Sequence, residues 1–482
     1  MLTLEEIGRF MADDESSERK RLAKVGHRYY EGDHDIKSYK LYCYNADGKL
    51  VEDTTRTNIK IAHPFFTELV DQCVQYMLSG DDPVVRSDDA ALQEEMDRYF
   101  GDDFLSELSE TLTDACAGGF GHMYALKGEG FRTRFEHAEA MGVIEVRAKD
   151  TDANAEHVIY WYVDRIDKGR KIVKRIQVWD DKETRYYVRV DNGQIAPDDS
   201  EPLNPRPHVV YEEDGERYGT NLGFIPFFRL DANRKQFSHL KPIKALIDDY
   251  DLMSCGMSNN IQDVSEAVWV VKGFQGENLE ELIQNVKTKK HIGVDTDGDV
   301  DVRTVDIPTD ARKAKLELDE KNIYRFGMGF NSAQVGDGNV TNIVIKSRYA
   351  LLDLKCNKLE RRLKAFMKKL VQVALDEINS EKGSAYTIAD VKIKFDREIM
   401  TNATDNAQIA LTDAQTEQVK VGTLLNVAST LGNDAVLEPL CAVLDLDVDE
   451  VRELLPEPED GGLEGASAAL AEAGEEPIGE VS

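Results

Sequence analysis

The strongest constraint on the fold is a periodic stripe of apolar residues in the last third of the chain. Spacings of four and three residues alternate along it, through Ile345, Tyr349, Leu352, Cys356, Leu359, Leu363, Phe366, Leu370 and Val373. This spacing places every member on one side of an α-helix. The stripe therefore predicts one continuous helix over residues 342–379, which is about 57 Å long at 1.5 Å per residue.

Helical spacing of apolar residues also occurs in five shorter segments. These segments are 4–30, 58–78, 102–117, 240–266 and 310–325. The glycines Gly118 and Gly119 suit a helix C-cap, and Pro242 suits a first helical turn. One face of the segment 240–266 carries Ile243, Ile247, Tyr250, Met257, Ile261 and Val264.

A β-rich region lies between residues 143 and 228. The runs HVIYWYVD, KIVKRIQVW and TRYYVRV are rich in β-branched and aromatic residues and are separated by turn signals, which predicts an antiparallel sheet. Residues 1–235 are thus expected to form one α+β region. A shorter β pattern, VKIKFD, follows the long helix at 391–396.

A second, smaller β-rich segment interrupts the helices at 267–308. It contains VWVVKGF, a short helical stretch at 279–286, and HIGVDTDGDVDVRTV. We expect a hairpin turn at Asp297-Gly298, because this pair tolerates the positive φ of a type I′ turn.

Three segments near the C-terminus carry weaker patterns. The stretch GMGFNSAQVGDGNVTN at 327–342 has four glycines and is expected to be a mobile loop. Residues 406–455 suggest short helices broken at Gly422 and Gly432. The tail from Pro456 is rich in Glu, Gly, Ala and Pro, which favours disorder.

Composition excludes several classes of protein. At 482 residues, of which 41% are hydrophobic and 31% charged, the chain has the length of about three folded domains. It carries 59 basic and 91 acidic residues, a formal net charge of −32. A nucleic-acid clamp needs a basic surface, whereas an acidic surface suits contact with DNA that must not adsorb.

The six cysteines are far apart in the sequence, without a C-x-x-C motif or a histidine at metal-ligand spacing, so we expect reduced thiols. The N-terminus lacks a signal-peptide core, and no stretch approaches 18 apolar residues. Neither secretion nor membrane spanning is expected.

Motifs for catalysis are weak. The chain has no GxxxxGK[ST] and no HExxH motif. Ser254 to Ser258 lack the strand-turn-helix context of a nucleophile elbow. Alternating Asp295, Asp297, Asp299 and Asp301 do not match an EF-hand, whose glycine and glutamate stand at other positions. We predict no catalytic residues, no cofactor and no metal site.

Positive charge gathers on the long helix, in contrast to the rest of the chain. Residues 342–369 contain two acidic residues, Asp353 and Glu360, and nine basic ones, which are Lys346, Arg348, Lys355, Lys358, Arg361, Arg362, Lys364, Lys368 and Lys369. One interpretation is a solvated face, or a face paired with acidic neighbours. The other is that Lys346 and Arg348, beside the glycine-rich loop, contact nucleic-acid phosphates.

Several stretches also follow one another in a recognisable order. They are YYEGDHDI at 29–36, NIK at 58–60, LVDQ at 69–72, PIK at 242–244 with IDDYD at 247–251, WVVKG at 269–273, and KSRY at 346–349. In this order they resemble the portal proteins of tailed bacteriophages of the siphophage type, whose N-terminal motif is YYxGxHxI. The chain departs from many relatives where Val340 to Val344 replace a small-residue Ser-Gly step before the long helix.

The resemblance implies a multi-domain α+β portal architecture. Its parts would be the wing (1–235), a stem helix (236–266), the clip (267–308), a second stem helix (309–326), the tunnel loop (327–341), the long spine helix with its return to the wing (342–400), the helical crown (401–455) and an acidic disordered tail (456–482). The tunnel loop would present Gly327, Asn331, Ser332, Gln334, Gly336, Gly338, Asn339 and Thr341 to DNA. The clip would bind partners through Trp269, Lys272, Lys289, Lys290, Asp297 and Gly298.

By the same resemblance, the function would be a ring-shaped channel, commonly of twelve subunits, for packaging and ejecting double-stranded DNA at one capsid vertex. The implied partners are the terminase, the major capsid protein, the scaffold and head-completion or adaptor proteins. The protein would reside in the virion, and in the host cytoplasm during assembly, without enzymatic activity of its own. Two alternatives remain: a metal-dependent enzyme acting on nucleic acid through Asp295 to Asp301, and a non-portal head or connector protein.

Overall fold

The computed structural model describes residues 1–45, 47–54, 56–127, 132–149, 154–167, 169–213, 216–264, 268–274, 292–303, 308–331, 342–397, 415–416, 418–424, 426–427 and 433–444. The chain divides into two compact units. The first contains residues 1–335 and 347–399, and the second contains residues 336–346 and 400–482.

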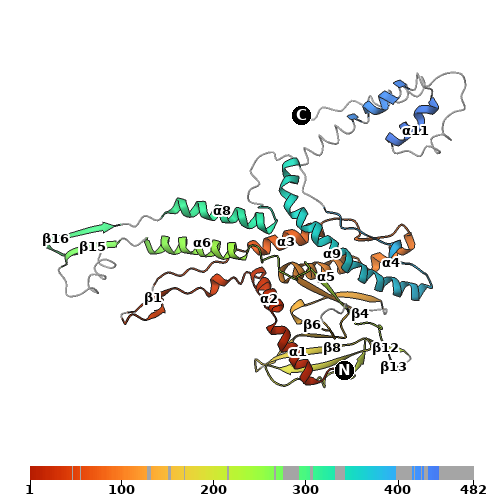
Figure 1. Cartoon of the computed structure of the whole chain (residues 1–482), viewed down its shortest axis with the longest axis horizontal. Coiled ribbons are helices and arrows are strands. Elements are labelled where there is room, and N and C mark those ends of the chain that lie inside the picture. Colours follow the sequence, from red (N-terminus) through yellow and green to blue (C-terminus); the bar gives the residue numbers. More distant parts are fainter. Residues whose placement is uncertain are drawn as a thin grey trace, which may run out of the picture. The chain divides into compact units, whose positions relative to one another are not determined.

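The first unit mixes helices and strands (Figure 1). The helices that lie in it or enter it are α1 (Leu4–Ser16), α2 (Glu18–Tyr30), η1 (Asp35–Ser38), α3 (Phe65–Met77), α4 (Ala90–Tyr99), α5 (Asp102–Gly118), η3 (Ala140–Gly142), α6 (Lys244–Val264), α8 (Thr309–Gly327), α9 (Asn342–Lys382) and η6 (Ile388–Asp390). The strands are β1 (Tyr42–Tyr44), β2 (Leu50–Glu52), β3 (Val85–Arg86), β4 (Phe120–Lys127), β5 (Thr133–Ala138), β6 (Val143–Val146), β7 (His157–Ile166), β8 (Ile172–Trp179), β9 (Glu183–Val190), β10 (Ala196–Pro197), β11 (Arg206–Pro207), β12 (Val209–Glu213), β13 (Glu216–Thr220), β14 (Phe227–Asp231), β15 (Val268–Phe274), β16 (Val294–Arg303) and β17 (Lys392–Ile393).

The predicted antiparallel sheet is confirmed. Its strands run in the order β10-β9-β8-β7-β6, and β11 also pairs with β9. Alternate residues of β7 face opposite sides, so Ile159 packs with Ile7 and Met11 of α1, whereas Val158 packs toward Phe227 of the three-stranded sheet β14-β4-β5. The large sheet is therefore covered by a helix on one face and by a second sheet on the other.

The N-terminal helical pattern divides into two helices. Ser17 has an extended ψ of 143°, and its hydroxyl accepts a hydrogen bond from the Lys20 backbone N–H. Such a side chain caps the start of a new helix and ends the preceding one. Helix α2 then crosses α5 so closely that a Cβ on Gly26 would lie 1.9 Å from the Ala117 carbonyl oxygen. Helix α5 ends as predicted, at Gly119 with a φ of +99°.

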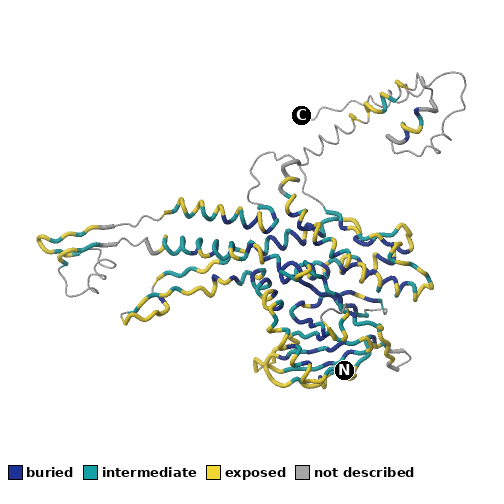
Figure 2. The backbone as a smooth tube through the Cα atoms, viewed as in Figure 1, coloured by how far each residue is buried: buried dark blue, intermediate teal, exposed yellow. Residues whose placement is uncertain are grey.

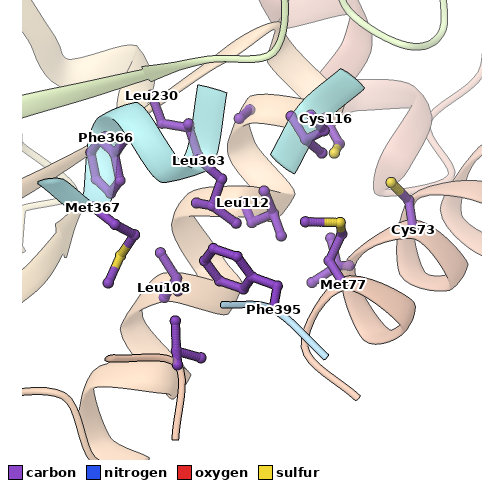
Figure 3. Packing of buried hydrophobic residues seen from close by; sticks show 14 of the residues in the cluster. Cys73, Met77, Leu108, Leu112, Cys116, Leu230, Leu363, Phe366, Met367 and Phe395 are labelled. Carbon is purple, nitrogen blue, oxygen red and sulfur yellow. The ribbon is translucent and has the colours of Figure 1, made fainter. Parts of the chain in front are cut away.

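The predicted long helix is confirmed as α9, which has 41 residues. The six stripe residues between positions 352 and 370 are all buried, namely Leu352, Cys356, Leu359, Leu363, Phe366 and Leu370. They pack with α3 and α5 in the largest core of the chain, part of which is shown in Figure 3. At about 1.5–3 kcal/mol for each large apolar side chain, the stripe contributes on the order of 10 kcal/mol.

The core also brings distant parts of the sequence together. Strand β17, which lies in the predicted VKIKFD segment, pairs antiparallel with β3. An ion pair between Arg86 and Asp396 lies beside this strand pair and joins residues 310 positions apart. The segment that follows α9 is thus built into the same core as the N-terminal helices.

Helices α6 and α8 pack side by side and are the two predicted helices before the glycine-rich loop (Figure 1). Ile243 and Ile247 at the start of this segment are buried, but Ile261 near its other end is 48% exposed. The predicted apolar face of α6 therefore joins the core only at its beginning. Figure 2 shows that burial is concentrated in the body of the unit and is lower along the two helices.

The hairpin turn expected at Asp297-Gly298 is wrong. Both residues lie inside β16, which pairs antiparallel with β15 from Val268 to Phe274. The ladder is irregular between Lys272 and Phe274, where Gly273 has a φ of +65°. A Cβ on Gly298 would lie 2.8 Å from the Lys272 carbonyl oxygen. Glycine is thus needed for a β-bulge with close backbone approach.

The described part of the second unit is helical at residues 418–424 and at α11 (Asn433–Leu444). The predicted break at Gly422 is wrong, because this residue lies within the helical stretch. Gly432 and the tail after residue 455 lie outside the described residues, as does the predicted short helix at 279–286.

Candidate functional site

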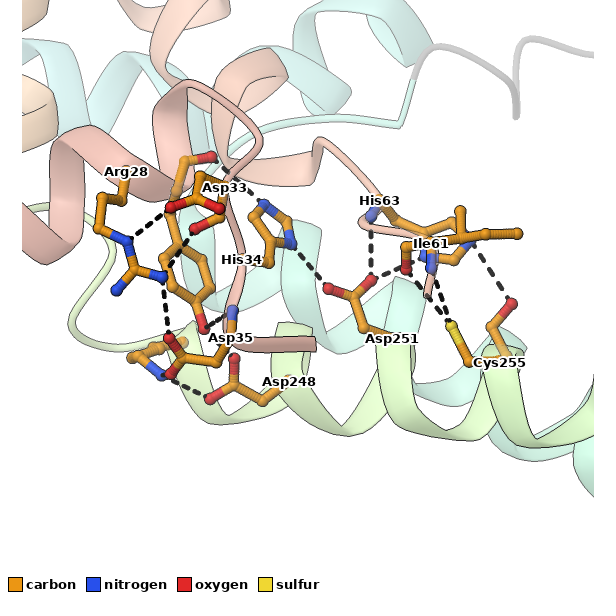
Figure 4. Close-up of polar contacts among 12 residues, drawn as sticks. Arg28, Asp33, His34, Asp35, Ile61, His63, Asp248, Asp251 and Cys255 are labelled. Carbon is orange, nitrogen blue, oxygen red and sulfur yellow. Dashed lines mark hydrogen bonds and ion pairs between the residues drawn. The ribbon is translucent and has the colours of Figure 1, made fainter. Parts of the chain in front are cut away.

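The motif at residues 29–36 is fastened to the first half of α6 (Figure 4). The Tyr29 hydroxyl donates a hydrogen bond to Asp248 of α6, and the Tyr29 ring stacks on His34 with 4.5 Å between centroids. Gly32, with a φ of +72°, provides the turn between these two aromatic residues. The motif therefore positions a helix more than 200 residues away in sequence.

Asp251 is the centre of this attachment and is fully buried. One carboxylate oxygen lies 2.7 Å from the His34 Nδ1, and the other lies 2.7 Å from the His63 Nδ1 and 3.0 Å from the His63 backbone nitrogen. Burial alone raises the pKa of Asp251, but the hydrogen bonds from His34 and His63 outweigh it, so the pKa is lowered. The carboxylate is thus ionised and holds both imidazoles as donors.

The group Asp251, His63 and Ser254 has the residue types of a catalytic triad but lacks the rest of such a site. The Ser254 Oγ lies 3.5 Å from the His63 Nε2, at the outer limit of a hydrogen bond. Ser254 also lies inside α6, where backbone N–H groups are used by the helix and cannot form an oxyanion hole. The arrangement supports a structural role for these residues.

A strap of residues 59–63 extends this attachment along α6. Backbone N–H groups of Ile59, Ile61 and His63 donate to side chains on α6. The acceptors are Asn259, Cys255 and Asp251, with distances of 2.7, 3.2 and 3.0 Å. The donors are every second residue of the strap, and the acceptors are every fourth residue of α6. Two residues of extended chain advance about 6.6 Å and four helical residues advance about 6 Å, so donors and acceptors stay in step.

The strap corrects the helix predicted over 58–78, because only Phe65–Met77 is helical. Pro64 disfavours a helical conformation of His63, and the backbone groups before it are occupied by α6 instead of by a helix of their own.

Charged side chains reinforce the inner end of α6. The Lys244 ammonium lies 2.7 Å from carboxylate oxygens of both Asp35 and Asp248. Burial lowers the pKa of Lys244, but the hydrogen bonds to these two carboxylates raise it well above its usual range. Lys244 therefore remains charged and links Asp35 of the YYEGDHDI motif to Asp248 of α6.

Helices α6 and α8 are joined by polar contacts along their length. The Lys315 ammonium pairs with Asp249 of α6 and with Asp319 of its own helix. The Arg312 guanidinium donates to the Gly256 carbonyl oxygen at 3.3 Å. At the inner end, the Tyr324 hydroxyl donates to Glu68 of α3 at 2.5 Å. The pair is thus bound to the body at its inner end.

Two residues predicted for the mobile loop are part of the ordered structure. Gly327 ends α8, and a Cβ there would lie 2.6 Å from the Leu69 side chain. Its carbonyl oxygen accepts a hydrogen bond from Lys355 at 3.1 Å. The Asn331 side chain donates to Glu320. Close packing and these bonds fix both residues. The other predicted loop residues, Ser332, Gln334, Gly336, Gly338, Asn339 and Thr341, lie outside the described part of the chain.

The basic residues of α9 have different environments. Lys355 is buried, and Lys364 pairs with Glu360 at 2.7 Å. Arg397 pairs with Asp353 and Glu360, the acidic residues of the same stretch. Exposed basic side chains of this stretch include Lys358, Arg361, Lys368 and Lys369. Lys346 and Arg348 lie on the first turns of α9, and their side chains are not described.

The hairpin β15–β16 has a row of exposed acidic residues. Asp299 and Asp301 alternate along the regular part of β16, about 6.8 Å apart along the strand. Asp295 and Asp297 lie in the irregular part opposite Gly273. Among the described residues, no three of these carboxylates lie close enough together to hold one ion. Of the predicted partner-binding residues, Lys272 is exposed and pairs with Asp299 in the register, and Trp269 pairs with Val302. Gly298 lies beside Asp297 in β16, whereas Lys289 and Lys290 lie outside the described residues.

Comparison with known proteins identifies relatives along most of the chain. The sequence model of a family described as "Phage portal protein, SPP1 Gp6-like" matches residues 10–456. The portal protein of Bacillus phage SPP1 is 28% identical over 384 residues, which cover 78% of this chain and 75% of that protein. The portal protein of Clostridium phage phiCD119 is 23% identical over 434 residues, covering 85% and 89% of the two chains. None of the described helices is long and apolar enough to cross a membrane.

Proposed function

The chain belongs to the SPP1 Gp6-like family of phage portal proteins, and from this membership we propose that its copies form a closed ring around a channel for double-stranded DNA. The ring would have twelve subunits and occupy one vertex of the capsid. The family is one of structural proteins of the phage head, so the proposed role needs neither catalysis nor a cofactor.

Exposed apolar residues on α6 and α8 carry the proposal of a ring. Leu252, Ile261 and Leu318 are 42%, 48% and 54% exposed. Exposed large apolar side chains are typical of surfaces that partners cover. Leu252 and Ile261 are nine residues apart and thus lie on opposite sides of α6, which suits a ring in which each subunit has two neighbours. Because Asp251 and Lys244 fix the inner end of the helix pair to the body, the pair can present these side chains to the neighbouring subunits in a defined orientation.

We assign the predicted parts to the structure on this basis. Residues 1–235 form the wing, residues 236–266 and 309–326 form the two stem helices, and residues 267–308 form the clip. The tunnel loop spans 327–341, and only its first five residues, 327–331, lie in the described part of the chain. Residues 342–400 form the spine and its return to the wing, 401–455 the crown and 456–482 the tail.

Charge supports passage of DNA without adsorption. The net charge of −32 per chain repels phosphates, whereas binding by release of counterions requires basic surface. Lys346 and Arg348 would make transient phosphate contacts beside the tunnel loop.

The clip would serve as the docking surface for other proteins. β15 and β16 form a sheet of two strands, and a ribbon of this size is marginally stable on its own. Its outer edges can accept strands or side chains from partners. The proposed partners are the terminase during packaging and head-completion or adaptor proteins afterwards. The scaffold and the major capsid protein would contact the ring during assembly in the host cytoplasm.

Imaging of the full-length protein tests the ring directly. Negative-stain electron microscopy, with mass photometry on the same sample, should show closed rings with a channel wide enough for duplex DNA. Leu318→Glu should shift the mass distribution toward smaller species, whereas Leu203→Glu, at a site on the body that is 41% exposed, should not. A monomer or dimer across a range of protein and salt concentrations would contradict the proposal.

The family match over residues 10–456 favours a portal over the two alternatives, a metal-dependent enzyme and a non-portal connector. The enzyme would need the β16 carboxylates to gather around an ion, and no three of them lie close enough together in the described part of the chain. Mg²⁺ or Mn²⁺ would raise the melting temperature if these carboxylates bound it. A connector without a channel would be distinguished by the top views of the imaging experiment.

A further inference from the structure

Four potential metal ligands from distant parts of the sequence meet in the main core. Cys73 lies on α3, Cys116 on α5 and Cys356 on α9, and His239 lies in the segment before α6. Ligand atoms of Cys73, Cys116 and His239 all lie within 4.8 Å of one another. The Cys356 Sγ is 3.7 Å from the Cys73 Sγ but lies outside this group of three, so it would have to shift to complete a four-coordinate site. Figure 3 shows Cys73 and Cys116 beside the packed apolar side chains.

The spacing of the sulfur atoms suits a tetrahedral ion better than a disulfide. With metal–sulfur distances of about 2.3 Å, two thiolates on a tetrahedral zinc ion are about 3.8 Å apart. The distance between Cys73 and Cys356 agrees with this value, whereas a disulfide requires about 2.05 Å. All three cysteines are free thiols.

The surroundings of the cluster provide a positive charge and a nitrogen ligand. The three thiols are 0% exposed. The buried Lys355 ammonium places a positive charge near all three thiols. In the described part of the chain, the buried Nδ1 of His239 has no hydrogen-bond partner, and such nitrogen atoms are usually satisfied.

We propose that Cys73, Cys116, Cys356 and His239 form a structural site for Zn²⁺. Three thiolates and an imidazole are a ligand set that zinc prefers in closed, four-coordinate sites. The His239 backbone N–H donates to the Cys116 carbonyl oxygen at 3.0 Å, which holds this histidine beside its neighbour in the site. Lys355 balances the single negative charge that three thiolates leave around Zn²⁺.

The proposed zinc site would connect several helices of the first unit. Its ligands come from α3, α5, α9 and the segment leading into α6. One ion would therefore fix the long helix and the start of the helix pair relative to the body. Because the unfolded chain has no preformed site, binding of Zn²⁺ stabilises the folded state.

The test measures zinc in the full-length protein purified under reducing conditions. We expect about one zinc per chain by elemental analysis. After chelation, added Zn²⁺ should raise the melting temperature, and Co²⁺ should give the absorption bands of a tetrahedral thiolate complex. Cys116→Ser and His239→Ala should lose both the zinc and the cobalt spectrum, whereas Cys441→Ser, at a buried cysteine outside the cluster, should retain them.

Three results would overturn the proposal. One is a reduced wild-type chain that takes up no zinc and shows no shift in melting temperature. Another is zinc content unchanged in both Cys116→Ser and His239→Ala, which would place the metal elsewhere. The third is a Cys73–Cys356 or Cys73–Cys116 disulfide in a metal-free chain, found by peptide mapping without reductant. His239→Ala removes a partly exposed side chain, so it serves as the test if the cysteine variant does not fold. None of these results bears on ring formation.

Discussion

Removal of the Asp251 carboxylate should release α6 from the body of the first unit. Asp251→Ala eliminates the acceptor of hydrogen bonds from the His34 side chain and from both the side chain and backbone of His63. Each charge-assisted hydrogen bond contributes about 1.5–3 kcal/mol, and breaking a buried pair on one side costs about 3–5 kcal/mol. The matched change Asp249→Ala removes an exposed pair with Lys315, for which we expect about 0–1 kcal/mol.

Hydrogen exchange followed by mass spectrometry measures this effect locally. A loss of about 3 kcal/mol raises the opening equilibrium on the order of a hundredfold, since 1.36 kcal/mol is tenfold. Peptides from Lys244–Val264 should therefore exchange much faster in Asp251→Ala than in Asp249→Ala. Equal exchange in the two variants would refute an anchoring role for Asp251. The volume-conserving Asp251→Asn should change exchange in the same direction.

The same pair of variants has a pH dependence with a defined sign. The pKa of Asp251 is lower in the folded chain than its ordinary value. The contribution of the Asp251 carboxylate to folding stability is therefore complete above the unfolded pKa of about 3.9. It is lost as the pH falls through the lower pKa of the folded chain. After correction for the pH dependence of intrinsic exchange, the difference in exchange of the α6 peptides between wild type and Asp251→Ala should be constant near neutral pH. It should become smaller in acid. A difference that grew in acid would contradict this assignment.

Two other predictions concern the DNA contact and the crossing of α2 with α5. Lys346→Ala and Arg348→Ala should each reduce DNA packaging without preventing ring assembly. Lys368→Ala, farther along α9, should leave packaging unchanged. Unchanged packaging in the first two variants would indicate that Lys346 and Arg348 are structural. Gly26→Ala should destabilise the chain by about 1–3 kcal/mol or more because its Cβ has no room. Gly256 lies in a helix, and a Cβ there would meet no atom within 4 Å. Gly256→Ala should therefore stabilise the folded chain by up to about 1 kcal/mol. Similar melting temperatures for the two glycine variants would contradict this reasoning.

The elements that could be predicted best from the sequence are those determined by residues within the element itself. The stripe of α9 repeats over many turns, so Leu352 to Leu370 could be placed on one face without knowledge of their partners. The helix predicted over 58–78 was too long because the strap is held by hydrogen bonds to Asn259 and Asp251. Apolar spacing within the segment carries no sign of acceptors 200 residues away.

The same limit applies to the site residues. The YYEGDHDI motif could be recognised, but its attachment to Asp248 and Asp251 appears only in the fold. Cys73 and Cys356 are 283 positions apart, so cysteine spacing, which finds local metal motifs, could not find them. Asp-Gly at 297–298 was a misleading turn signal because glycine has a second use at bulges and close backbone contacts.

The pairing of β3 with β17 has a consequence for synthesis on the ribosome. Domains generally fold as units while the nascent chain is being made, yet the first unit needs α9 for its core and Lys392–Ile393 for one of its strand pairs. The apolar faces of α3 and α5 are therefore fully covered only after translation has passed residue 393. Subunits can then associate only after translation is almost complete, so neighbouring nascent chains on one messenger RNA are protected from premature assembly.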